Sequence, residues 1–278
     1  MSRARPGSAG PARAVWVAAG LAGALPLARA DQPLWEAGLG IGFLRLPHYR
    51  GSDQSRDWVV PVPFIAYRGD IFKADREGAR AVLLDTERVD FDVSVAATAP
   101  TRSDENDARQ GMPDLAATLE LGPNLNVTLA RGAEWKLQLR APIRAALTLE
   151  ADPKMVGWLA SPNLNLDTKV NGWSVGLLAG PLFGSRSFNG YFFDVAPQFA
   201  TPSRPSYQTP GGFGGWRAIA STSRRLGALW MGGFVTADTV RGAVYDNSPL
   251  VRKHGTLAFG FAVSWVFAES SQRVPDEN

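Results

Sequence analysis

Apolar and polar residues alternate along most of the chain after residue 30. The longest run covers residues 134–150. In a β-strand, successive side chains point to opposite faces, whereas a helix would scatter these apolar residues around its circumference. The alternation therefore predicts an all-β protein of long strands. In residues 134–150 one face carries Trp135, Leu137, Leu139, Ala141, Ile143, Ala145, Leu147 and Leu149, and the other carries Glu134, Lys136, Gln138, Arg140, Arg144, Thr148 and Glu150.

Twelve segments of this kind are expected. The alternative is ten, if residues 71–98 form only one crossing and the count is adjusted elsewhere as well. Turn residues such as Gly132, Asn171-Gly172 and Gly227 separate several of them. With twelve strands, the long polar segment 99–113 is expected at the same end as the short turns. The expected strands are Leu34–Leu46, Trp58–Tyr67, Ile71–Leu84, Arg88–Thr98, Asp114–Ala130, Glu134–Leu149, Gly157–Val170, Trp173–Phe183, Tyr191–Phe199, Phe213–Arg225, Ala228–Ala237 and Thr256–Phe267.

Alternation alone does not say which face is outside, because β-sandwiches and lipocalin-like barrels alternate too. Sandwich strands usually have ~5–6 residues, however, and a tilted membrane crossing takes ~9–11. The polar face also carries full charges, and tryptophans are expected at strand ends, as in interfacial girdles. We therefore predict a closed, antiparallel, up-and-down transmembrane β-barrel with its apolar face toward lipid. The tryptophans are Trp35, Trp58, Trp135, Trp158, Trp173 and Trp265.

Residues 1–30 have the features of a cleaved signal peptide. The segment contains four arginines and no acid, an apolar stretch over residues 14–28, and Ala28-Arg29-Ala30 before Asp31. Residues 31–278 are then expected to form a single outer-membrane barrel domain. The polar tail, residues 269–278, is expected to be disordered. The predicted location is the outer membrane of the cell.

Composition excludes several other classes. Without the leader's four arginines, 25 basic residues face 26 acidic ones, a net charge of about −1 that leaves no basic patch for nucleic acid. The chain has no cysteine and two histidines, so disulfides and thiolate chemistry are excluded and a His-rich metal site is not expected. No cofactor is expected.

The segments between the strands resemble the MipA/OmpV family of outer-membrane proteins. The resemblance spans essentially the whole mature chain. It implies a scaffold that brings a membrane-bound lytic transglycosylase together with a bifunctional penicillin-binding protein, in contact with lipopolysaccharide and outer-membrane lipid. The family offers no catalytic residue. The matching segments are Tyr49–Asp53 with Arg56, Pro61–Gly69, Leu119–Pro123, Leu139–Arg144, Tyr207–Arg225 and Phe259–Phe267.

Three alternative functions stay open: a small-solute channel, an adhesin, and an outer-membrane lipid or ester hydrolase. An outer-membrane lipid or ester hydrolase would need a nucleophile and a base, and His48, Ser52, Asp53 and His254 lie in loops that a closed barrel brings together. We favour polar loops over this site, because nothing marks an oxyanion hole.

A small-solute channel is another candidate function. Opposite charges on facing strands attract, so we expect the interior charges to plug the lumen. Pro61 and Pro63 lack the ladder N–H and predict a kink or an unpaired stretch near the periplasmic end. The expected interior charges are Arg88, Lys136, Arg140, Arg144, Asp90, Asp92, Glu120 and Asp167.

Overall fold

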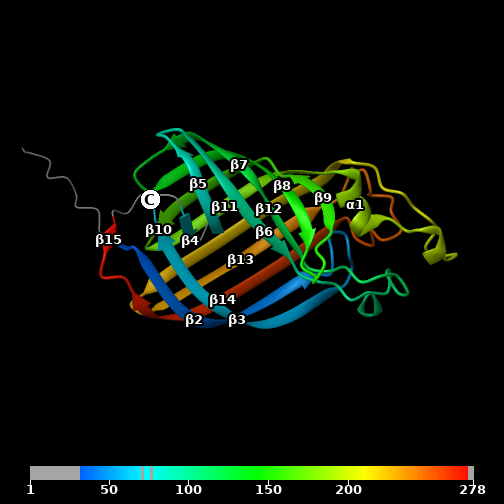
Figure 1. Cartoon of the computed structure of the whole chain (residues 1–278), viewed down its shortest axis with the longest axis horizontal. Coiled ribbons are helices and arrows are strands. Elements are labelled where there is room, and N and C mark those ends of the chain that lie inside the picture. Colours follow the sequence, from blue (N-terminus) through cyan, green and yellow to red (C-terminus); the bar gives the residue numbers. More distant parts are fainter. Residues whose placement is uncertain (1–31, 70–71, 76–77, 275–278) are drawn as a thin grey trace, which may run out of the picture.

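A computed structural model describes residues 32–69, 72–75 and 78–274, and its regular structure is mainly antiparallel sheet (Figure 1). The all-β prediction is confirmed. The predicted signal peptide lies outside the described residues. The strands of the main sheet are β2 (Trp35–Pro47), β3 (Ser55–Arg68), β4 (Phe72–Asp75), β5 (Gly78–Asp85), β6 (Val89–Thr98), β7 (Thr118–Arg131), β8 (Trp135–Thr148), β9 (Met155–Ala160), β10 (Asn163–Val170), β11 (Trp173–Gly184), β12 (Gly212–Leu226), β13 (Leu229–Thr239) and β14 (Gly255–Glu269).

Neighbouring strands in the sheet are mostly neighbours in sequence, and β14 pairs with β2. Strands β9 and β10 form one interrupted crossing, because both pair with β8 and both pair with β11. Pairing of β10 with β8 and of β9 with β11 joins the two ends of the strand order. Counting β9 and β10 together, the sheet has twelve strands, the number predicted.

Two of the predicted strands are wrong, and the two errors compensate in the count. The segment predicted as one strand, Ile71–Leu84, contains the hairpin of β4 and β5, in which Phe72 pairs with Ala81. The other, Tyr191–Phe199, contains the end of helix α1 (Arg186–Phe193) and a 3-10 turn (Pro197–Phe199). The Ser185 hydroxyl accepts a hydrogen bond from the Phe188 N–H at 3.2 Å, and this N-cap fixes the start of the helix.

The additional hairpin also corrects the place of the long segments. Because every neighbouring pair is antiparallel, β6 ends at the same end of the sheet as β2, so residues 99–117 lie beside residues 48–54 and not with the short turns. The short turns gather at the opposite end, near the described start of the chain (Figure 1). One of them, Asn171-Gly172, has positive φ at both residues (51° and 78°), as a tight two-residue hairpin turn requires.

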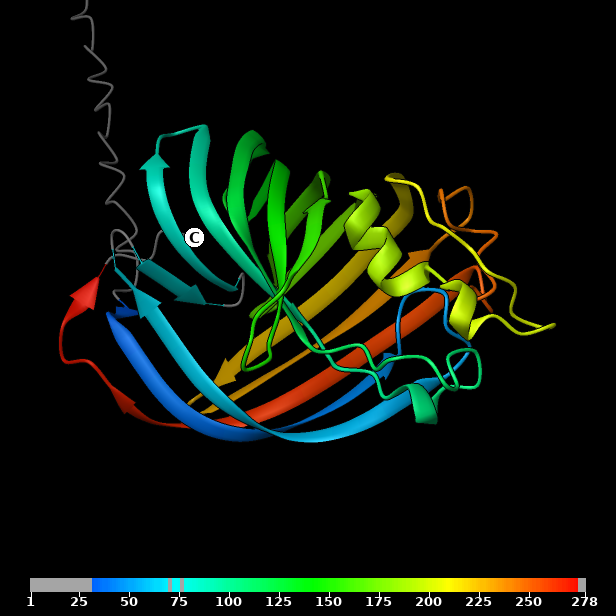
Figure 2. The same ribbon diagram turned by 45° about the vertical axis from the view of Figure 1, so that its right-hand side comes forward.

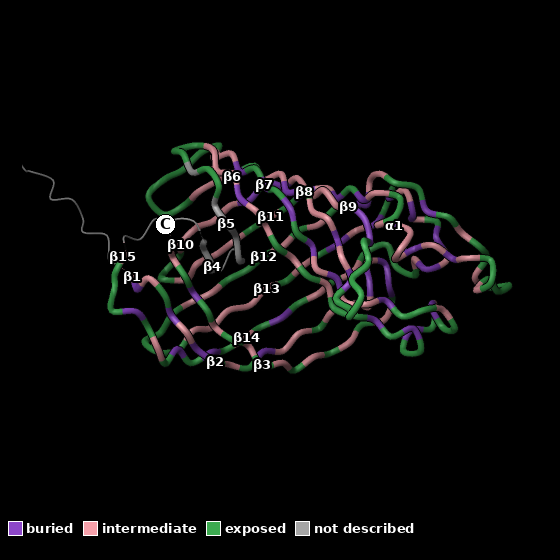
Figure 3. The backbone as a smooth tube through the Cα atoms, viewed as in Figure 1, coloured by how far each residue is buried: buried purple, intermediate pink, exposed green. Residues whose placement is uncertain are grey.

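The charged face of the sheet is the buried one, and the apolar face is exposed. Buried or intermediate positions alternate with exposed ones along many strands (Figure 3). On β7, Glu120 and Asn126 are buried, whereas Leu121 and Leu125 are more than two-fifths exposed. The tryptophans predicted for the girdles lie on the exposed face near strand ends, except Trp58, whose ring is on the inner face with the Arg56 guanidinium 4.6 Å away. Trp230 also lies on the inner face, where its ring contacts Phe64. The most exposed large apolar side chains are Leu39, Ile41, Val59, Ile65, Leu83, Leu257, Phe261, Trp265 and Phe267.

Strand β3 has a free edge. Among its residues only Tyr67 and Arg68 pair with β4, so the described structure gives residues 55–66 no strand partner on that side (Figure 2). The Arg68 N–H donates to the Leu34 carbonyl on the β2 side, so by strand alternation the nitrogens of Pro61 and Pro63 face the free side. The predicted unpaired stretch is therefore present, in the middle of the strand. Proline suits this edge because it has no N–H to leave unpaired.

The tail after β14 is ordered as far as it is described, against expectation. Residues Arg273–Val274 (β15) pair with Gln32–Pro33 (β1), and the Ser270 N–H donates to the Trp35 carbonyl at 2.8 Å. This pairing ties the two ends of the described chain together at the short-turn end of the sheet.

Candidate functional site

The buried face holds a cluster of ionised side chains from facing strands. Arg217 on β12 donates to Asp238 on β13 through Nε (2.8 Å) and Nη2 (2.9 Å). Arg50, from the loop after β2, places Nε 3.4 Å from the same carboxylate. Its Nη1 donates to the Tyr245 hydroxyl at 2.9 Å. One buried carboxylate thus holds two strands and a loop together.

Two further layers of charge fill the interior toward the short-turn end. Arg140 donates to Asp167 at 3.2 Å, which confirms these two residues as interior charges that pair across strands. At the end itself, Glu36 lies 2.7 Å from Arg68 and 3.3 Å from Arg225. Each acid contacts a base on another strand, as expected if these side chains fill the interior rather than line an open channel.

The other predicted interior charges divide into two groups. Asp92 is buried and accepts hydrogen bonds from the Asn124 and Asn126 amides, and Arg144 donates to the Ser94 hydroxyl at 2.9 Å. Glu120 is also buried. Strand register places Lys136 opposite Asp167 and Asp90 opposite Asn126, and the Arg88 carbonyl accepts a hydrogen bond from the Thr128 N–H.

Sequence reasoning missed Arg50, Arg217 and Asp238, although a signal for one pair was present. The turn at Gly227 places Leu226 opposite Leu229, and counting outward from there in an antiparallel hairpin puts Arg217 opposite Asp238. Arg50 belongs to a distant loop, and no local pattern connects it to this pair.

The long segments pack together into a cap over one end of the sheet. Its center is Tyr245, whose ring stacks on Phe193 with centroids 3.8 Å apart and whose hydroxyl donates to the Gly214 carbonyl at 2.8 Å. Arg109 pins the segment 99–117 to the α1 segment by donating to the Phe192 carbonyl. This arrangement, called the loop cap below, has the buried apolar residues Tyr49, Leu115, Phe193, Val195, Val240, Ala243, Tyr245 and Leu250.

The residues considered for hydrolysis lie at the edge of the loop cap. The Asn106 amide donates to Ser52 Oγ at 3.1 Å and lies 3.0 Å from His48 Nδ1, so it stands between the serine and the histidine. Ser52 is 2% exposed, and its hydroxyl donates to the Gln54 carbonyl. His254 is exposed, and the described residues include no hydrogen bond between it and His48. His48 and Ser52 therefore lie near each other, but their side chains bind Asn106 and so connect the loop after β2 to the segment 99–117.

The His48 site predicts a pH-dependent loop cap. Burial lowers the pKa of His48, and Arg56 lowers it further, whereas Glu105 opposes this shift. A histidine with a depressed pKa stabilises the fold above the unfolded value of 6.5, and that contribution is lost as pH falls toward the folded pKa. Proteolysis of residues 99–117 should therefore accelerate below about pH 6.5.

The matched control is His48→Gln, which keeps a side-chain acceptor for Asn106 but does not titrate. It should flatten the pH profile of the cleavage rate. An unchanged profile in this variant would mean that another group controls the loop cap.

No helix among the described residues has the length and apolar character to cross a membrane. In residues 32–69, 72–75 and 78–274, no three side chains of His, Asp or Glu are grouped so that they would hold a metal ion.

Comparison with known proteins identifies one family. Residues 39–267 match the family model described as MltA-interacting protein MipA. No curated protein matches the chain.

Three solved structures match the chain with TM-scores of 0.27 to 0.33. The outer membrane phospholipase A of Escherichia coli is 10% identical, with 84% of this chain and 94% of that chain covered and a TM-score of 0.33. The CymD monoaromatic hydrocarbon channel is 10% identical, covers 86% and 90%, and scores 0.33. The outer membrane protein OprD of Pseudomonas aeruginosa is 8% identical, covers 87% and 96%, and scores 0.27.

Proposed function

Since this chain belongs to the MltA-interacting protein MipA family, we propose that it is an outer-membrane β-barrel and a non-catalytic scaffold for murein enzymes. One observation supports the proposed barrel most strongly: apolar side chains are exposed on one face of the sheet, and charged side chains are buried on the other. Lipid offers no hydrogen bonds, so a sheet in it must pair its own backbone. The β8–β10 and β9–β11 pairings support closure by joining the two ends of the strand order, although residues 55–66 of β3 have no described strand partner on one side.

The proposed orientation follows from the ends of the sheet. In outer-membrane barrels, short turns face the periplasm and long segments face outward. The loop cap would then meet lipopolysaccharide, and the short-turn end, with β1 and β15, would face the periplasm. A lytic transglycosylase and a bifunctional penicillin-binding protein act on murein in that compartment, so we assign the scaffold surface to this end.

A pull-down from solubilised envelopes tests the scaffold. The tagged protein should retain a murein hydrolase or synthase, and a variant that lacks residues 270–278 tests whether the tail contributes. Its matched control carries substitutions in the loop cap segment 201–206, at the opposite end. Recovery of only lipid and lipopolysaccharide would contradict the scaffold while leaving the barrel intact.

The channel alternative makes a different prediction. The paired interior charges and the loop cap support a plugged lumen, so the purified protein should give no stable open-channel current in a planar bilayer. A steady conductance that persists after repurification would overturn the plugged interior and favour a solute pore.

A further inference from the structure

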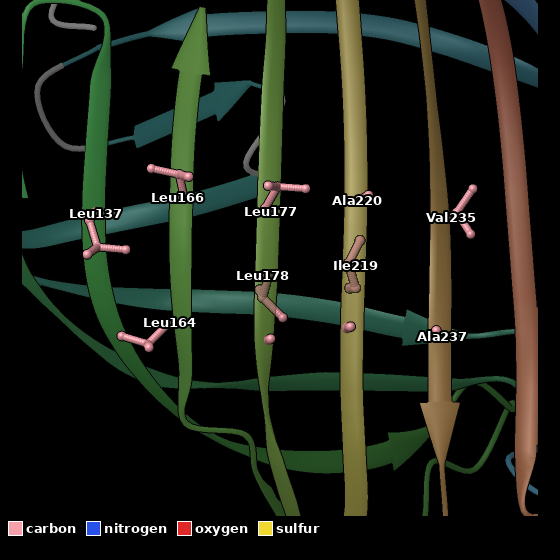
Figure 4. A pocket seen from close by; sticks show the side chains of 11 residues that line it. Leu137, Leu164, Leu166, Leu177, Leu178, Ile219, Ala220, Val235 and Ala237 are labelled. Atoms are coloured by element: carbon pink, nitrogen blue, oxygen red, sulfur yellow. The ribbon is translucent and has the colours of Figure 1, made fainter.

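The exposed face of the sheet contains an apolar hollow that the proposed function does not use. It has a volume of about 460 Å³ and spans the neighbouring strands β8, β10, β11, β12 and β13 (Figure 4). All the residues that line it are apolar, and two of them, Leu178 and Ile219, have their side chains on the opposite face by strand alternation. The lining residues are Leu137, Leu164, Leu166, Leu177, Leu178, Ala179, Ala218, Ile219, Ala220, Val235 and Ala237.

The hollow lies on the outside of the sheet. Leu164, Leu177 and Val235 on its walls are 50%, 45% and 49% exposed. Gln138 and Asn165, one residue along their strands from wall leucines, are buried on the opposite face. The hollow therefore faces the proposed lipid, not the filled interior.

Strand register explains why the surface is hollowed here. Ala218 on β12 lies between Ala179 on β11 and Ala237 on β13, so three adjacent strands carry only methyl groups in one row. In the next row, Ala220 lies between Leu177 and Val235. The result, called the alanine trough below, runs along β12 with larger side chains on both sides.

The positively charged side chain of Arg224 lies on the same face of β12 as the alanine trough. Two and four residues beyond Ala220, Thr222 and Arg224 share its face of β12. The Arg224 guanidinium lies 5.6 Å from the Trp173 ring, and no ion pair connects it to any other described residue. With a rise of ~3.3 Å per residue, Arg224 is roughly 13 Å from Ala220.

We propose that the alanine trough binds one phospholipid of the periplasmic leaflet, with an acyl chain along β12 and the phosphate at Arg224. The inference rests on the proposed membrane orientation, which places Arg224 and Trp173 at the periplasmic interface. Arginine pairs well with phosphate, and tryptophan suits the headgroup level. Arg224 thus matches the phosphate of a phospholipid, and the apolar trough matches one of its acyl chains.

The width of the trough selects this occupant. Beside Ala220, its walls are Leu177 on β11 and Val235 on β13, two strand spacings or roughly 9–10 Å apart. An extended acyl chain fits between them, whereas a partner helix with its side chains is ~10–12 Å wide and would have to displace the wall leucine. A helix would also leave the cation at Arg224 without a matching group.

Native mass spectrometry of the full chain released from vesicles of phosphatidylethanolamine and phosphatidylglycerol tests the site. The unaltered protein should retain one phospholipid. Filling the trough by Ala218→Leu with Ala220→Leu should reduce retention about tenfold, because contact with at least two methylenes is lost. Arg224→Gln should reduce it as well, and Arg224→Lys should restore part of it.

Matched controls separate this site from general lipid adhesion. Ala141→Leu, on the same face of β8, and Arg131→Gln, exposed at the same end of the sheet, should leave retention unchanged. Equal retention in the trough-filled protein would overturn the proposal, and so would displacement of the lipid by glycerol phosphate alone. Flotation of the unaltered protein with the vesicles separates these outcomes, since protein that does not float contradicts the membrane assignment itself.

Discussion

Replacing Asp238 with alanine is expected to destabilise the protein by about 3–5 kcal/mol. The side chain is buried, and its carboxylate faces two guanidinium groups, those of Arg217 and Arg50. Removing it leaves two cations in the interior without their counterion, and the energetic cost of unpaired buried charge is much larger than the value of a surface pair. Urea unfolding of the protein in detergent micelles or vesicles measures the loss.

The exposed pair of Arg45 and Asp57 is the matched control. Its side chains are 50% exposed on both partners, so Asp57→Ala should cost about 0–1 kcal/mol. A second variant with apolar replacements of both Arg217 and Asp238 should recover part of the loss, although Arg50 stays without its partner. Equal effects of Asp238→Ala and Asp57→Ala would show that the interior is wet and that the charges there are screened.

Tyr245→Ala is the second substitution with a large expected effect, about 3–5 kcal/mol. The side chain is 2% exposed and stacks on Phe193, and its hydroxyl contacts both Gly214 and Arg50. Its removal opens a cavity at the center of the loop cap, where long segments hold one another. We expect faster proteolysis within residues 185–211 and a lower thermal unfolding midpoint.

Tyr245→Phe separates packing from hydrogen bonding. It keeps the ring on Phe193 but leaves the Gly214 carbonyl and an Arg50 N–H without the hydroxyl, which should cost about 1–3 kcal/mol. If alanine and phenylalanine have the same small effect, the loop cap is held by its backbone and not by this aromatic center.

Period-two alternation was sufficient to predict most of the sheet, because burial of one face acts on every second residue. Strands β7, β8 and β11 begin and end within four residues of their predicted bounds. The pairing of Arg140 with Asp167 also followed, since both were assigned to the interior face of neighbouring strands.

The two errors have different physical reasons. Residues 191–199 carry apolar side chains at alternate positions, but a helix capped by Ser185 delivers Phe193 to a core made by other loops, so tertiary contacts override the local pattern there. The segment 71–84 was predicted as one strand because the sequence between Asp75 and Gly78, which pair in the hairpin, carries a weak turn signal.

The contacts at the edge of the loop cap and near the strand ends could be predicted from the sequence only in part. His48 and Ser52 were correctly placed near each other, yet Asn106, which stands between them, comes from a loop 54 residues further along than Ser52. Trp58 was assigned to the outer girdle and lies on the inner face beside Arg56. Side chains near strand ends depend on loop packing, which alternation does not encode.

Accessibility of spin labels to oxygen tests the central claim most directly. The chain has no cysteine, so each introduced cysteine is the only thiol. In lipid vesicles, labels at Leu139 and Ile143 on β8 should collide freely with oxygen and little with a polar nickel complex, whereas labels at Gln138 and Ala146 should be shielded from oxygen. A reversed pattern, or a protein that stays soluble and monomeric without detergent, would contradict the outward apolar face.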